Sequence, residues 1–257
     1  MAPLGICVAG ATGWTGSAVA EAVAAAEDLE LRSAVSRSAA GTTIGGAPVF
    51  ASVTDALDGV AVLIDYTAHD VVKRHVLTAI ERGVAVVIGS SGLTAADYEE
   101  IDAAACSRGV GVIAAGNFSV TAAMAQAAAL LAARHLDRWE VIDYASATKA
   151  DAPSGTAREL AERLGEVRHP AVDVPAAQPT RGDEIGGAQV HSVRLPSFTV
   201  STEVIFAEPD ERLSIRHDAG SSAAPYVAGT LLAARAASGR VGLTRGLDTL
   251  LLDQRST

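Results

Sequence analysis

A glycine-rich turn near the start of the chain constrains the fold more than any other feature of the sequence. An apolar run at residues 5–9 predicts a buried strand, residues 17–27 predict an alanine-rich helix, and residues 30–35 predict a second strand. The turn between the first strand and the helix is GATGWTG, with glycines at every third position. Strand, glycine turn, helix and strand in this order are typical of a dinucleotide-binding unit.

Each glycine of this turn has a physical reason to be there. Gly10 permits the tight turn, Gly13 lets the backbone approach a pyrophosphate, and Gly16 lets the helix pack near the sheet. The helix N-terminus adds N–H donors for phosphate. The spacing GxxGxxG differs from the common GxGxxG, and a glycine-rich corner without a ligand is the alternative. The flanking strand and helix favour binding, and the expected contacts are Gly10, Thr12, Gly13, Trp14, Thr15 and Gly16.

The end of the second predicted strand bears on the choice of cofactor. A site for NAD places a carboxylate there to bind the ribose 2′-hydroxyl. This chain has Val35-Ser36-Arg37-Ser38 at that point, with no acidic residue. Because a guanidinium attracts a 2′-phosphate, Ser36 and Arg37 predict NADPH, with NADH still possible. The alternative is that Arg37 is a solvated surface charge.

Strand and helix patterns continue to alternate along the first half of the chain, which predicts a parallel sheet covered on both faces. After residue 117 the pattern changes to a long helix, a second short helix and several strands, one of them with the alternation of an antiparallel strand. The predicted fold class is α/β, with a Rossmann-like domain at 1–117 plus about 225–257 and an α+β domain at 118–224. The expected strands are 60–66, 84–88, 110–114, 140–146, 188–194, 199–207 and 212–217; the expected helices are 70–82, 95–108, 120–135, 157–164 and 223–238; 167–187 is expected to be a loop.

The charge and composition exclude several classes of protein. The 20 Lys and Arg residues against 30 Asp and Glu give a net charge of −10, which argues against nonspecific nucleic-acid binding. No apolar run is long enough for a membrane span, and the start lacks the basic region of a signal peptide. Cys7 and Cys106 both lie in apolar surroundings, which predicts buried thiols in a reducing compartment. We therefore expect a cytoplasmic protein with no nucleic-acid, membrane or metal partner.

A second motif, KADAPSGTA at residues 149–157, points to a carboxylate-binding site. Pro153 and Gly155 favour a turn, and Ser154 or Thr156 can cap the helix that follows. The N–H groups of Gly155 and Thr156, together with the helix dipole, suit a carboxylate. Lys149 is placed to neutralise a second carboxylate or to donate a proton. A well-capped helix start without a ligand is the alternative.

At this motif the chain resembles the 4-hydroxy-tetrahydrodipicolinate reductase family, also called dihydrodipicolinate reductases, which carries the signature KxDAPSGTA. The resemblance extends over nearly the whole chain in ordered motifs: the glycine turn, Asp65-Tyr66-Thr67, Gly89-Ser90-Ser91-Gly92, Gly116-Asn117-Phe118-Ser119-Val120, 182–186 and 191–194. It implies a Rossmann-like domain and a mixed-sheet domain that assembles homotetramers. It also implies reduction of a small cyclic imine dicarboxylate in lysine biosynthesis, with NADH or NADPH.

The resemblance also implies roles for individual residues. The nicotinamide side of the site would be lined by Tyr66, Thr67, Gly89, Ser91, Asn117 and Phe118. The substrate carboxylates would be held by Lys149, Ser154, Gly155 and Thr156, and the domain 118–224 would bind substrate and form the oligomer.

The chain departs from the family at the residues that transfer the proton. Ala145 and Ser146 stand where the family signature has a pair of histidines, and neither is a useful acid near neutral pH. His191 and His217 remain elsewhere in the same domain, but a lone histidine is more often structural. We predict a reductase with an altered substrate, an imine or an activated double bond, and with Lys149 as the catalytic residue. The alternatives are the lysine-pathway reductase with Lys149 as its acid, and a non-catalytic cofactor-binding protein.

Overall fold

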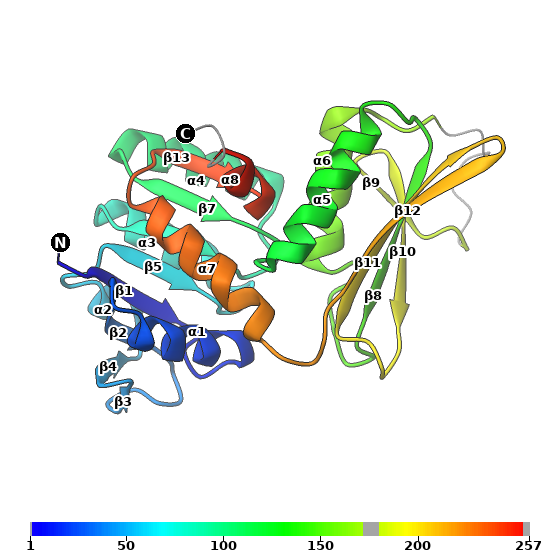
Figure 1. Ribbon diagram of the computed structural model, residues 1–257. Helices are drawn as coiled ribbons and strands as arrows, with labels where there is room; N and C mark the ends of the chain where they lie inside the picture. The colour runs from blue at the N-terminus through cyan, green and yellow to red at the C-terminus, as the bar shows by residue number, and fades with distance from the viewer. Residues whose placement is uncertain (1, 172–179, 254–257) are drawn as a thin grey trace. The chain divides into compact units, whose positions relative to one another are not determined.

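The computed structural model describes residues 2–171 and 180–253. The chain divides into two compact units, Met1–Ser119 with Ala223–Thr257, and Val120–Ser222. Each unit has its own sheet and its own helices (Figure 1). Among the described residues, no helix has the length and apolar character needed to cross a bilayer.

The first unit is built on an eight-stranded sheet. Its strands are β1 (Leu4–Ala9), β2 (Leu29–Val35), β3 (Thr43–Ile44), β4 (Ala47–Phe50), β5 (Val62–Asp65), β6 (Ala85–Ile88), β7 (Gly111–Ala114) and β13 (Gly242–Arg245). They lie in the order β13-β7-β6-β5-β1-β2-β4-β3, and neighbours run parallel except for the antiparallel pair β3 and β4. Every residue of β5, β6 and β7 is buried, as expected for parallel strands covered on both faces.

Six helices accompany this sheet in the described chain: α1 (Trp14–Ala25), α2 (Val53–Ala56), α3 (Val72–Glu81), α4 (Ala95–Arg108), α7 (Ala224–Ala237) and α8 (Leu247–Asp253). Helices α1 and α7 pack together on one face, and α3 and α4 pack together on the other (Figure 1). The strand order reverses between β1 and β5. In open α/β sheets, ligands bind outside the carboxyl ends of the strands at such a reversal.

The second unit has a mixed five-stranded sheet with helices α5 (Val120–Ala133) and α6 (Gly155–Val167). Its strands are β8 (Trp139–Ala145), β9 (Asp183–Ile185), β10 (Ala188–Arg194), β11 (Val200–Glu208) and β12 (Glu211–Asp218), in the order β12-β11-β8-β10-β9. Only β8 and β10 run parallel among these described pairs. Burial alternates strictly along β8, so one face of the central strand meets the core that α5 and α6 cover.

The predicted fold class is confirmed, and two expectations are wrong. The segment 167–187, expected to be a loop, contains β9, which is held by antiparallel pairing with β10; residues 172–179 of that segment lie outside the described chain. Cys106 is exposed rather than buried, because its side chain lies beside the start of the edge strand β13, with its Sγ 3.6 Å from Asp102 Oδ1. Cys7 is buried as predicted, and burial raises the pKa of its thiol to about 12.

Candidate functional site

The predicted cofactor site begins at the turn between β1 and α1. Gly10 has φ 81°, a conformation that favours glycine, and its N–H donates to the carbonyl of Val35 over 2.9 Å. A Cβ on Gly16 would overlap the carbonyl oxygen of Gly10, so only glycine lets α1 begin this close to the strand end. Gly13 is the N-cap residue and makes no side-chain cap, and the first turn of α1 carries no acidic residue. This helix start therefore suits a pyrophosphate.

The end of β2 carries hydroxyl groups and an arginine. Ser36 Oγ lies 2.8 Å from Thr12 Oγ1 and 3.2 Å from Ser38 Oγ, which joins the glycine turn to this strand end. Arg37 is exposed, and the structure gives it no ion pair with any described residue. A 2′-phosphate would meet three hydroxyls and a guanidinium here, and no carboxylate.

A buried aspartate ties together the loops after β5 and β6. The Oδ1 atom of Asp65 accepts from Thr67 N over 2.9 Å, Thr67 Oγ1 over 2.6 Å and Ser90 Oγ over 2.7 Å. His75 Nδ1 lies 2.9 Å from its other oxygen, Oδ2. Because Asp65 is fully buried, these four contacts fix the backbone on which Thr67, Gly89 and Ser91 lie. Neither Asp65 nor His75 was predicted to be a positioning residue. Asp65 opens the Asp-Tyr-Thr motif, which is a signal in the sequence, whereas nothing in the sequence marks His75.

Tyr66 packs inside the first unit rather than offering its hydroxyl as an acid. Its hydroxyl lies 2.6 Å from Thr230 Oγ1 on α7, and burial raises the pKa of Tyr66 above its ordinary value. Its ring meets Phe118 edge-on, with centroids 6.2 Å apart, and a Cβ on Gly89 would overlap it. Asn117 Oδ1 accepts from Ser119 N over 2.8 Å after β7. These contacts hold the Tyr66 ring in one position near the carboxyl ends of the parallel strands.

The remaining predicted cofactor residues fall in the same region of the first unit. Trp14 is exposed and stacks edge-on against Tyr226, with centroids 5.7 Å apart, and Thr15 follows it in the first turn of α1. Ser91 is exposed after β6. All of these residues follow the carboxyl ends of β1, β2, β5, β6 and β7, which in a parallel sheet share one edge.

In the second unit, the KADAPSGTA motif lies on a turn that a buried aspartate holds in place. Ser154 is the N-cap of α6, and its Oγ accepts from Ala157 N over 3.3 Å. Asp143, fully buried on β8, accepts from Ser154 N over 2.9 Å and from Ser154 Oγ over 2.7 Å. Arg194 donates both to Asp143, over 2.8 Å, and to the carbonyl of Asp151, over 2.7 Å. The start of α6 is therefore rigid.

Asp143 and Arg194 were not singled out by the sequence analysis. Asp143 had one available signal, since it is the acidic residue two positions before Ala145 in the motif region. The hydroxyl of Ser154 donates to Asp143 and accepts from Ala157 N in its own helix. The role of Ser154 is therefore to shape the turn. Thr156 follows Gly155 in the first turn of α6.

Lys149 is half-buried and already has a partner, because its Nζ lies 2.8 Å from Asp151 Oδ1. Ala145, at one of the two positions where the sequence resemblance implies histidines, is fully buried at the end of β8, and Ser146, at the other, has its Oγ 2.9 Å from Thr148 Oγ1. Neither can donate a proton near neutral pH. Lys149 therefore supplies a positive charge at this turn, and the carboxylate of Asp151 partly neutralises that charge.

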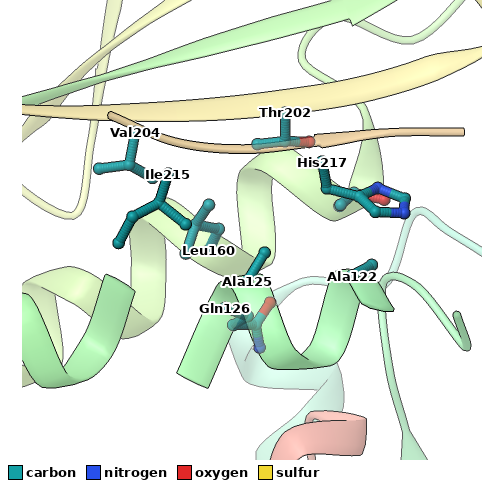
Figure 2. Close-up of a pocket in the computed structure, with 9 residues that line it drawn as sticks. Ala122, Ala125, Gln126, Leu160, Thr202, Val204, Ile215 and His217 are labelled. Carbon is teal, nitrogen blue, oxygen red and sulfur yellow. The ribbon is translucent and has the colours of Figure 1, made fainter. Parts of the chain in front are cut away.

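The two other histidines of this unit differ in their surroundings. His191 Nε2 lies 2.8 Å from Glu140 Oε2, and Arg181 contacts the same carboxylate, which is the pattern of a structural histidine. His217 on β12 instead lines a small cavity together with Thr156 (Figure 2). Among the described residues, no group of three or more His, Cys, Asp and Glu side chains is arranged to hold a metal ion.

Comparisons with known proteins extend over the whole chain. Residues 4–118 match the family model described as dihydrodipicolinate reductase, N-terminus, and residues 116–251 match the C-terminus of the same family. A 4-hydroxy-tetrahydrodipicolinate reductase of Synechococcus elongatus is 35% identical, covering 97% of this chain and 99% of the relative. The corresponding reductase of Nocardia farcinica is 38% identical, covering 95% of this chain and 97% of the relative. A dipicolinate-bound dihydrodipicolinate reductase from Paenisporosarcina sp. TG-14 superposes with a TM-score of 0.76 at 25% identity, covering 96% of this chain and 99% of that one.

Proposed function

Because this chain belongs to the dihydrodipicolinate reductase family and is an NAD(P)H-dependent oxidoreductase, we propose that it reduces an imine or an activated double bond of a small carboxylated substrate. We further propose that this substrate differs from that of its relatives. The observation that supports the proposal concerns one turn of the second unit. The carboxylate motif at residues 149–157 is intact, while a fully buried alanine, Ala145, stands at a position where the resemblance implies a histidine.

Lys149, Gly155 and Thr156 hold the substrate in this proposal, and Ser154 fixes the turn that carries them. The N-terminus of α6 stabilises a carboxylate through its N–H groups and its partial positive charge. Lys149 neutralises a carboxylate, and its ammonium also supplies a proton when the reduced atom takes one up. A substrate that arrives as a protonated iminium needs no acid, which suits a site that has lost both histidines.

The first unit holds the cofactor in this proposal, and the residues present fit a dinucleotide. When bound, NADPH supplies the hydride. Gly10, Gly13 and the uncapped start of α1 accommodate the pyrophosphate. A side chain at Gly10 would overlap the carbonyl group of Tyr66, so the tight turn itself requires glycine there. Arg37 and the hydroxyls of Ser36 and Thr12 bind the 2′-phosphate, which makes NADPH the preferred cofactor and NADH the weaker one.

The second candidate function is lysine-pathway 4-hydroxy-tetrahydrodipicolinate reductase with Lys149 as the acid. It is favoured by relatives of that name, which are 33–38% identical over nearly their whole length. The non-catalytic alternative is dropped, because the family is one of oxidoreductases. By analogy with the family we also propose a homotetramer and a cytoplasmic location; light scattering of the purified protein tests the first.

One assay separates the two candidate functions. Purified protein with NADPH is given 4-hydroxy-tetrahydrodipicolinate, and separately a panel of other cyclic imino acids and enoyl acids, while nicotinamide absorbance is followed. We expect kcat/KM on at least one panel member to exceed that on 4-hydroxy-tetrahydrodipicolinate by about tenfold or more. The reverse order would establish the second candidate and overturn the altered substrate. Loss of NADPH binding on Gly16→Ala, in a protein that remains folded and whose Gly239→Ala control still binds NADPH, would support the proposed cofactor site at the start of α1.

A further inference from the structure

A small cavity lies inside the second unit, between its two helices and the last two strands of its sheet. Two cross-strand residue pairs of β11 and β12, here called rungs, form one wall of the cavity. In one rung Thr202 lies opposite His217, and in the other Val204 lies opposite Ile215. Side chains two residues apart lie on the same face, so a polar rung stands next to an apolar rung. Figure 2 shows Thr202 and His217 together at one end, with Val204, Ile215 and Leu160 at the other.

The polar rung presents two buried atoms that have no hydrogen-bond partner among the described residues. These atoms are Thr202 Oγ1 and His217 Nδ1. Thr202 is only 6% exposed, so its hydroxyl has little access to solvent. Buried polar atoms are nearly always paired in native proteins, since an unpaired one loses its hydration and gains nothing in return. Two such atoms on one rung, facing one cavity, therefore indicate a ligand that pairs with them.

The chemistry of the wall favours an anionic oxygen. Nine described residues line the cavity; His217 is the titratable one among them, and none of the nine is an Asp, Glu, Lys or Arg. Thr156, in the first turn of α6, brings the positive end of that helix to the wall. Gln126 directs its amide at Glu159 Oε1 over 2.9 Å, so the nearby carboxylate is already engaged. A hydroxyl and an imidazole N–H at a helix N-terminus form a donor set for a carboxylate.

The size of the cavity limits what can enter it. Its volume is about 20 Å³, enough for a group the size of a water molecule and too small for a ring. The ligand is therefore one substituent of a larger molecule whose remainder lies outside the cavity. Burial lowers the pKa of His217, which favours the neutral ring, and a neutral imidazole donates through a single N–H.

We propose that His217 Nδ1 and Thr202 Oγ1 bind an oxygen of one carboxylate of the substrate, and so select a dicarboxylate over a monocarboxylate. The inference rests on the proposed function, because it concerns the same substrate that Lys149 and the start of α6 bind. Lys149, which also forms an ion pair with Asp151, binds one carboxylate of the substrate. The uncharged donors of His217 and Thr202 bind the other carboxylate. His217 and Thr202 are specificity-determining residues in this scheme.

The test measures binding of two probes to the full-length protein in the presence of NADPH, by titration calorimetry. The probes are pyridine-2,6-dicarboxylate, which is the dipicolinate of the similar solved structure, and pyridine-2-carboxylate. We expect Thr202→Val and His217→Gln each to weaken binding of the dicarboxylate about tenfold, and that of the monocarboxylate by less than about threefold. Thr202→Ser and His217→Asn, which keep a donor near the original atoms, should retain most of the affinity.

Stability and a matched control exclude a structural role. Thr202→Val removes an unpaired hydroxyl without changing the shape, so the Tm of the unliganded protein should rise or stay constant while affinity falls. Ser214→Ala removes an exposed hydroxyl from the opposite face of β12 and should leave both affinities unchanged. Equal losses for the two probes, unchanged affinities, or failure of the wild-type protein to bind the dicarboxylate would each overturn the subsite.

The same titrations keep this inference separate from the proposed function. A protein that reduces its substrate, yet binds the dicarboxylate equally well in all variants, retains the proposed function and loses the subsite. A protein that binds the dicarboxylate through His217 and Thr202 but reduces no substrate with NADPH retains the subsite and loses the proposed function.

Discussion

The two units of this protein each offer a helix N-terminus for an anion, and they build it in opposite ways. In the first unit, α1 starts at a glycine with no side-chain cap, and the turn is narrow because Gly10 and Gly16 lack a Cβ. In the second unit, α6 starts at Ser154, which caps the helix and is itself bound by buried Asp143. One of the two proposed anion sites is formed by the absence of side chains, and the other by a network of side chains.

The difference suits the ligands that each site is proposed to hold. A pyrophosphate must approach the backbone closely, and any side chain would stand in its way. A small carboxylated substrate must be held in one orientation for reaction, and a rigid turn supplies that orientation. The comparison therefore predicts that added atoms harm the first site, while removed atoms harm the second.

The largest effect should come from adding one methyl group to the first unit. In Gly16→Ala, the new Cβ overlaps the carbonyl group of Gly10, so α1 must shift away from β1. We expect a loss of about 2–3 kcal/mol in the free energy of unfolding, and at least a hundredfold weaker NADPH binding by fluorescence titration. Gly239→Ala in the same unit is the control, since only one atom lies within 4.0 Å of its added Cβ. Normal NADPH affinity in Gly16→Ala would show that the site is not built by close approach.

Removing the buried carboxylate should do comparable damage in the second unit. Asp143→Ala leaves Arg194 largely buried without its partner and frees the N-terminal turn of α6. We expect a loss of about 3 kcal/mol in urea unfolding and a large fall in kcat/KM, with NADPH affinity unchanged. Asp28→Asn, which breaks an exposed pair with Arg235, is the control and should change stability little. A drop in NADPH affinity in Asp143→Ala would mean that the two sites are not independent.

Lys149 offers a narrower test of the second site, and the chain contains its own control. Lys149→Met should raise KM for the substrate about tenfold or more, because a charge-assisted contact to a carboxylate is lost. Stability should change little, since the ion pair with Asp151 is partly exposed. Lys73, the other lysine of the chain, pairs with Asp97 and Glu100 on the surface, and Lys73→Met should leave KM unchanged. An unaltered KM in Lys149→Met would place the substrate elsewhere.

Much of the first unit could be predicted from sequence because its signals are local. Strands β1, β2, β5, β6 and β7 are short apolar runs between helical patterns, and the glycine turn lies within one stretch of the chain. Strand β13 was not predicted, because its four residues become a strand only by pairing with β7, far away in sequence. The hairpin of β3 and β4 was missed for a different reason, since its strands have only two and four residues.

The supporting networks could not be predicted, since their partners are remote from one another in sequence. Asp143 meets Arg194 51 positions later, and nothing in the local pattern of either residue marks the contact. Thr202 and His217 are ordinary members of two strands until the register places them opposite each other. The expectation that Cys106 is buried was wrong for a related reason. Only Ile101 and Ala105 are buried on the helix α4, and the apolar residues next to Cys106 in sequence do not indicate which side of that helix is covered.

The smallest expected effect concerns cofactor choice at the end of β2. Arg37→Asp places a carboxylate where a 2′-phosphate is proposed to bind, so KM for NADPH should rise about tenfold while KM for NADH stays the same or falls. The fold should be unaffected, because Arg37 is exposed. Arg32→Gln on β2 removes another exposed arginine, which pairs with Glu30, and it should not change the ratio. If Arg37→Asp keeps the wild-type ratio as Arg32→Gln does, Arg37 does not contribute to cofactor choice, and the proposed 2′-phosphate contact at the end of β2 is wrong.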